Sequence, residues 1–156
     1  MTPLAGNYIA CAAICLVFLT LDANAASCRQ FAREAQSAIK IHVAALRRYE
    51  HEASDRLKGL DSRPFEFLRD EVKKTAAIIG EAKALADEEE LKRCRNATQP
   101  IRKICSEAAQ MLLEILEKHL AESKPDYDKP RYAAAMGDCE KLMGFKPLKS
   151  AIRRTD

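Results

Sequence analysis

Cysteine is the residue type in this 156-residue chain whose chemistry is easiest to predict. Four cysteines lie in the body of the chain: Cys28, Cys94, Cys105 and Cys139. Four thiols can form two disulfides in an oxidising compartment, or they can bind one zinc ion. Zinc sites of this kind usually contain a C-x-x-C pair, and no such pair occurs here. Disulfides are therefore the favoured interpretation, and a four-cysteine zinc site is the alternative.

Two of the three histidines lie on apolar faces of predicted helices. His42 and His119 follow the apolar residues of their segments at helical spacing, whereas His51 lies among charged residues and is expected to be solvated. Four-helix bundles can hold haem or metals between such residues, but a histidine at the edge of a core is the favoured interpretation. One haem-type pair matches in height along the predicted helices, namely His42 with Met111. These two residues are the candidate cofactor-binding residues.

The sequence contains no recognisable catalytic motif. There is no H-E-x-x-H, C-x-x-C-H or G-x-S-x-G pattern and no glycine-rich phosphate loop. The acidic run at 87–90 could bind a hard cation, but consecutive helical residues point in different directions and basic residues follow it. A solvated helix face explains the run better. The sequence therefore predicts a protein that is not an enzyme, with no catalytic residue, no metal site and no cofactor.

The N-terminus carries a predicted export signal. Residues 9–21 are dominated by apolar side chains, and Ala23-Asn24-Ala25 forms an A-x-A cleavage site. This run of 13 residues is shorter than the roughly 20 that a spanning helix needs. We expect residues 1–25 to be a signal peptide, with no membrane span after its removal. A periplasmic or secreted location agrees with the disulfide interpretation. A lipid on Cys28 is a minor alternative, because the large aliphatic residue expected three positions upstream is missing.

Composition excludes several classes of partner. After cleavage 131 residues remain, with all 26 basic residues and 22 of the 23 acidic ones, so the formal charge is +4. This mild, evenly mixed charge argues against nucleic-acid binding. The chain lacks Trp and has few aromatic residues, which argues against a sugar-stacking site. Ala, Leu, Lys, Glu and Arg dominate, as is typical of long helices.

Apolar spacing predicts an all-α fold. Apolar residues recur at intervals of three and four in four segments, interrupted in the first segment by Glu50. The predicted helices lie near residues 28–58, 63–94, 99–122 and 129–143. Short connections predict two helical hairpins in one antiparallel four-helix bundle. We assign the bundle to residues 26–144, followed by a basic C-terminal tail at 145–156 for which the sequence indicates no partner.

Capping residues place the helix ends. Ser27 and Gln30 form a potential capping box at the start of the first helix. A cap residue followed two positions later by proline recurs at 62–64, 98–100 and 128–130. Gly59 and Gly144 are expected to end the first and fourth helices. Gly80, inside the second helix, suggests a bend or a close contact.

The hairpins also predict the disulfide pairing. An antiparallel second helix brings Cys94 back to Cys28, and the second hairpin brings Cys139 back towards Cys105. We therefore expect Cys28–Cys94 and Cys105–Cys139, which staple the bundle with two disulfides. All four sulfurs lie towards one end of the bundle, so Cys28–Cys139 with Cys94–Cys105 is the alternative.

These features predict an exported, non-enzymatic helical protein that binds another macromolecule, either a protein or an envelope component. A haem- or metal-binding four-helix bundle is the alternative, and an enzyme ranks third. The sequence contains no feature that fixes the partner or the oligomeric state.

Overall fold

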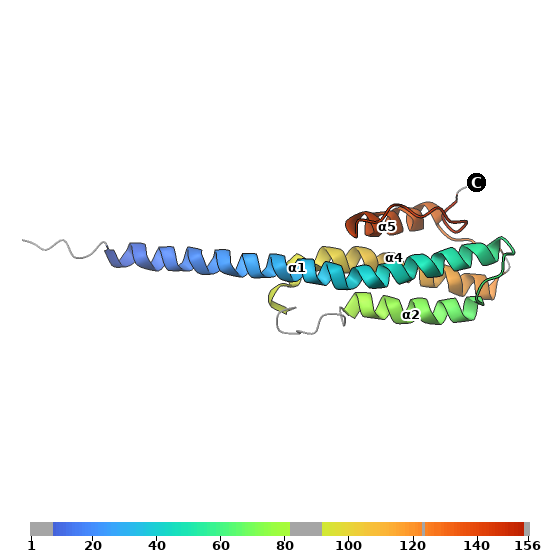
Figure 1. Ribbon diagram of the computed structural model, residues 1–156, viewed down its shortest axis with the longest axis horizontal. Helices are drawn as coiled ribbons and strands as arrows, with labels where there is room; N and C mark the ends of the chain where they lie inside the picture. Colours follow the sequence, from blue (N-terminus) through green and yellow to red (C-terminus); the bar gives the residue numbers. More distant parts are fainter. Residues whose placement is uncertain (1–7, 82–91, 123, 155–156) are drawn as a thin grey trace, which may run out of the picture.

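The computed structural model describes residues 8–81, 92–122 and 124–154 of the chain (Figure 1). This part contains four α-helices and no β-strand: α1 (Tyr8–Leu57), α2 (Phe65–Glu81), α4 (Arg95–Ala121) and α5 (Lys129–Leu142). Successive helices run in opposite directions, and α4 packs against each of the other three. The predicted all-α antiparallel four-helix bundle is confirmed.

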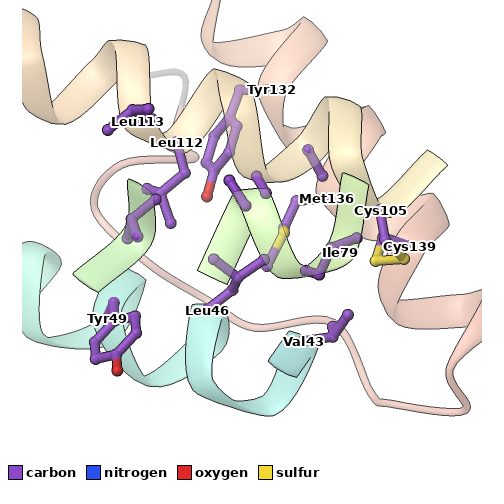
Figure 2. Close-up of a cluster of buried hydrophobic side chains, with 14 of the residues drawn as sticks. Val43, Leu46, Tyr49, Ile79, Cys105, Leu112, Leu113, Tyr132, Met136 and Cys139 are labelled. Atoms are coloured by element: carbon purple, nitrogen blue, oxygen red, sulfur yellow. A yellow bond between two sulfur atoms is a disulfide. The ribbon is translucent and has the colours of Figure 1, made fainter. Parts of the chain in front are cut away.

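Apolar side chains from all four helices form one core. Figure 2 shows Leu46 of α1, Ile79 of α2, Leu112 of α4 and Met136 of α5 in the same cluster. Each of these four side chains is fully buried. Their burial follows from the spacing of three and four, which gives each helix one apolar face, and removing that face from water is the main stabilising contribution.

Two disulfides join the helices as predicted. Cys28 in α1 is bonded to Cys94, the residue before α4, with the two Cα atoms 5.1 Å apart. Cys105 in α4 is bonded to Cys139 in α5, with the Cα atoms 4.9 Å apart (Figure 2). The alternative pairing is therefore not formed. The first bond also uses the Cys28 sulfur that a lipid anchor would require.

Three predicted helix ends are confirmed. The side chain of Asp128 accepts a hydrogen bond from the backbone N–H of Arg131 at 2.9 Å, as an N-cap does. Gly59 and Gly144 follow α1 and α5 with φ angles of 76° and 72°. This left-handed conformation strains residues with a side chain, so glycine suits both positions.

Three predicted caps are not formed. α1 continues through Ser27, and the side chain of Gln30 donates to Glu34 at 3.1 Å instead of capping. Ser62 donates its hydroxyl to a carbonyl of α1 at 2.8 Å. Thr98 is buried inside α4, where its hydroxyl donates to the Arg95 carbonyl at 3.2 Å. The hydroxyls of Ser62 and Thr98 thus donate to backbone carbonyl groups, a local bond that Ser and Thr side chains often make in or beside helices.

Gly80 allows α2 and α4 to approach closely. A Cβ atom at this position would lie 3.2 Å from the Ser106 Oγ of α4. The guanidinium group of Arg102 also donates to the Gly80 carbonyl at 3.0 Å. The predicted close contact at this glycine is thus present.

The segment after α5 packs against the bundle, and we call residues 145–154 the C-terminal strap. It runs back along α5 towards the C-terminal end of α1 (Figure 1). Ile152 is fully buried in the core, and its carbonyl accepts a hydrogen bond from the Tyr127 hydroxyl at 3.2 Å. The Ala151 N–H donates to Ser54 of α1 at 2.7 Å. The C-terminal strap therefore packs against the helical bundle of the same chain, a contact that the sequence did not indicate.

The N-terminal part of α1 extends past the ends of the other helices (Figure 1). Within the described side chains, the buried residues of α1 begin at Phe31. Nowhere in the described residues is there a helix with both the length and the apolar character needed to cross a membrane. The predicted cleavage after Ala25 falls in this protruding part and stays a prediction.

Candidate functional site

A buried cluster of four charged side chains joins α1, α5 and the C-terminal strap. Arg153 of the strap contacts Glu50 of α1 at 2.6 Å and Glu140 of α5 at 2.8 Å. Arg47 of α1 lies 2.8 Å from Glu140 on its other side. Both carboxylate side chains have 0% exposure and that of Arg153 has 8%, whereas that of Arg47 is 23% exposed, so the cluster is buried except at its Arg47 edge.

Hydrogen bonds from neighbouring groups complete this cluster. The hydroxyl of Ser150 donates to Glu50, and the N–H of Leu148 donates to Glu140 at 3.4 Å. Two carboxylates and two guanidinium groups balance each other in formal charge. Buried charges persist when they are paired and hydrogen-bonded in this way.

The ionisation of the cluster follows from its pairing. Burial alone would raise the pKa of Glu140, but hydrogen bonds and charge interactions with Arg153 and Arg47 hold that pKa below its ordinary value. The pKa of Arg153 is raised by its two carboxylate partners against the opposing effect of burial. Nearby, burial and the charge of Glu50 hold the pKa of the Tyr132 hydroxyl well above its usual range. Glu140 is thus ionised at neutral pH, and both carboxylate side chains are buried beneath the strap.

Sequence reasoning did not find this cluster. Glu50 did give a signal, because it interrupts the apolar stripe of the first helix at a position that proves fully buried. Arg153 and Glu140 gave no such signal, since both lie among other charged residues in the sequence. Their proximity depends on the path of the strap, which local spacing does not encode.

His119 lies at the edge of the core, as predicted. Its ring stacks on Phe65 of α2, with centroids 5.4 Å apart, and meets Tyr127 edge-on at 5.8 Å. The Nε2 atom is buried and has no hydrogen-bond partner. Burial, assisted by the positive charge of Lys129, lowers the pKa of this imidazole. His119 thus acts as an apolar ring in this position.

One of the two candidate cofactor-binding residues, Met111, lines a surface hollow. Met111 lines a hollow between α4 and the start of α5, together with Glu114, Ile115, Lys118, Tyr127, Asp128 and Arg131. His42, partly buried on α1, does not line it. A haem held between His42 and Met111 stays a prediction that a visible absorption spectrum of the purified protein would test.

The other candidate ligands lie apart from each other. His51 is 57% exposed and pairs with Asp55 at 3.4 Å, in agreement with the prediction that it is solvated. Among the described residues no group of three or more His, Cys, Asp or Glu side chains is arranged to hold a metal ion. The acidic run at 87–90 lies outside the described residues.

A second hollow lies between the end of α2 and the first turns of α4. It is lined by Gly80, Arg95, Gln99, Arg102, Lys103 and Ser106. Three of these residues are cationic and none is acidic. The Nε atom of Arg102 is buried and has no hydrogen-bond acceptor. We call this hollow the basic hollow.

Comparisons with protein-family models, with curated proteins and with solved structures found no match to this chain. The class that the fold itself defines is an all-α antiparallel four-helix bundle with two intramolecular disulfides.

Proposed function

We propose that this chain is an exported, non-enzymatic helical protein that binds another macromolecule, a protein or a component of the cell envelope, in the periplasm or outside the cell. The observation that carries the proposal is the burial of the charged cluster. Glu50 and Glu140 are the kind of groups that could do acid–base chemistry, but they are buried and paired with Arg153. They stabilise the position of the strap, so interaction with other molecules falls to the outer surface.

Export is supported by two independent features. The apolar run at 9–21 and the A-x-A site after it have the form of a cleavable signal. Two intramolecular disulfides suit an oxidising compartment, where such bonds form and persist. A compact scaffold in which disulfides tie α1 to the start of α4 and α4 to α5 presents a rigid surface, and rigid surfaces lose less conformational entropy on binding.

Affinity capture tests the proposal. The protein, purified after export with its disulfides intact, is immobilised and exposed to periplasmic extract or culture medium from the native source. We expect one macromolecule to be retained in a saturable manner and to be displaced by free protein. The control is the same protein after reduction and alkylation of all four cysteines, which should lose the partner together with its fold.

Two results would contradict the binding proposal. If the folded protein retains nothing beyond what the reduced and alkylated control retains, the binding proposal is wrong. Turnover of a small molecule by the purified protein would also contradict it, because the proposal assigns no catalytic residue.

A further inference from the structure

We propose that the basic hollow binds a phosphate-type oxyanion carried by the partner macromolecule. This inference rests on the proposed function and gives its binding site a chemical class. Its first support is charge. Arg95, Arg102 and Lys103 bring three formal positive charges to one hollow, and no carboxylate is among the described residues that line it. Glu107, the acidic residue one turn beyond Lys103, pairs instead with Arg131 of α5 at 3.4 Å.

Arg102 provides the second support. Its Nη2 atom donates to the Gly80 carbonyl at 3.0 Å, which fixes the guanidinium group at the wall of the hollow. Its Nε atom is buried without an acceptor. The N–H groups of its terminal nitrogens that do not bond to Gly80 can donate to an anionic oxygen in the hollow. A guanidinium group that is already fixed loses little freedom when it binds an oxyanion.

The remaining lining suits an oxyanion with several oxygens. Ser106 and Gln99 add a hydroxyl and an amide beside the three cations. Because Gly80 has no Cβ, which would come within 3.2 Å of the Ser106 Oγ, that hydroxyl keeps its place at the hollow. A carboxylate would offset one of the three positive charges, whereas a phosphate group offsets up to two and offers more acceptor oxygens. Phosphate chemistry therefore fits this hollow better than carboxylate chemistry.

Titration calorimetry with inorganic phosphate at low ionic strength tests the site directly. We expect saturable binding that weakens in 0.5 M NaCl, because salt screens exposed charges. Lys103→Gln and Arg95→Gln should each weaken binding several-fold. Arg102→Gln should weaken it by about tenfold or more, the effect expected of losing a hydrogen bond to a charged group. Lys124→Gln, which removes an exposed charge beyond the other end of α4, is the matched control and should bind phosphate like the wild type.

Two results would overturn the inference. One is the absence of phosphate binding by the wild-type protein. The other is equal affinity in the wild type, Lys103→Gln and Arg95→Gln, whose altered side chains are exposed and leave the core unchanged. Thermal unfolding of Arg102→Gln shows whether its loss of binding reflects the site or the fold. If Arg102→Gln is unstable, the phosphate affinities of Lys103→Gln and Arg95→Gln alone test the site.

A vesicle-binding experiment distinguishes a lipid headgroup from a free or polymer-borne phosphate. The protein is mixed with vesicles of phosphatidylcholine alone or with added phosphatidylglycerol. Binding that requires phosphatidylglycerol and falls in Lys103→Gln identifies a lipid headgroup. Phosphate binding without vesicle binding identifies a free or polymer-borne phosphate, and the site stands in either case. If the protein captures a macromolecule but does not bind phosphate, the phosphate site is wrong and the proposed function stands. If it binds phosphate but captures no macromolecule, the proposed function is wrong and the phosphate site stands.

Discussion

Glu50 and Glu140 place two carboxylates in the interior of a small bundle, where an unpaired charge costs several kcal/mol. They are tolerated because Arg153 contacts both carboxylates and Arg47 contacts one of them. A cluster of this kind adds little net stability compared with apolar packing, but it fixes which groups must meet. At the scale of single residues, it holds the strap in position together with the buried Ile152 and the Ala151–Ser54 hydrogen bond.

Removing Arg153 should therefore destabilise the protein strongly. We expect Arg153→Met to lower the free energy of unfolding by about 3–5 kcal/mol, because two buried carboxylates lose their shared partner. Urea denaturation at pH 7 measures this change. Arg154→Met removes the same charge from the adjacent exposed position and should change stability by about 0.5 kcal/mol or less. Similar midpoints for the two variants would show that the buried pairs do not fix the strap.

The lowered pKa of His119 predicts how the stability of the protein depends on pH. Because its pKa is lowered in the folded protein, the unfolded chain binds the proton more readily. Its contribution to stability is complete above its ordinary pKa of about 6.5 and is lost as pH falls towards its folded-state pKa. We expect the melting temperature to fall between pH 7.5 and 5.5, and to fall less in His119→Phe, which keeps the ring but cannot titrate.

The control for this pH profile is His51→Phe, since the His51 side chain is largely exposed. Its profile should follow that of the wild type. Glu140 contributes acid sensitivity in a lower range, because its depressed pKa gives stability that is lost only below about pH 4.5. Equal slopes for the wild type and His119→Phe between pH 7.5 and 5.5 would contradict the assignment to His119.

At the scale of helices, α4 is the element that contacts each of the others. Its apolar face carries Leu112 near the middle of the helix, fully buried against side chains from the other helices (Figure 2). Glu114, two residues later, is exposed. The two positions share the same helix and differ mainly in the direction that they face.

Leu112→Ala should leave a cavity and lower the free energy of unfolding by about 2–5 kcal/mol. Glu114→Ala should change it by no more than about 0.5 kcal/mol. Chemical denaturation of both variants with the wild type gives the comparison. Equal stability of the two variants would mean that the apolar stripe of α4 is not core, and the bundle description would fail.

How far the sequence predicts these elements depends on how local their cause is. The spacing of residues such as Leu46 and Leu112 revealed the helices, and the hairpin geometry revealed both disulfides. The cap at Asp128 was predictable, whereas Ser62 and Thr98 were misassigned, because the chain path decides which backbone group each hydroxyl meets. The strap escaped prediction because it has no helical period, and its contacts with α1 join residues about a hundred positions apart.

The basic hollow illustrates the same limit in the candidate site. Arg95, Arg102 and Lys103 look like ordinary solvated charges in the sequence, and the mild net charge gave no hint of a local excess. What distinguishes them is the contact between Arg102 and the backbone of α2 at Gly80. The sequence suggested a bend or close contact at Gly80, but it did not show which residues would surround it.

At the scale of the whole molecule, the first disulfide matters most if the chain is cleaved as predicted. Cleavage after Ala25 leaves Cys28 as the third residue of the exported protein. A helix that starts there would fray, because the first turn lacks partners for its N–H groups. The bond from Cys28 to Cys94 ties this turn to the start of α4 and limits fraying.

Mass spectrometry of the exported protein tests export and cross-linking together. We expect the intact mass of residues 26–156, reduced by the four hydrogens lost in forming two disulfides, with no thiol available for alkylation until reductant is added. Peptide mapping without reduction should recover Cys28 with Cys94, and Cys105 with Cys139. A retained N-terminus would contradict cleavage, and free thiols would contradict an oxidising compartment. A lipid attached to an N-terminal Cys28 would be incompatible with the first disulfide, so it would also leave the start of α1 without its tether to α4.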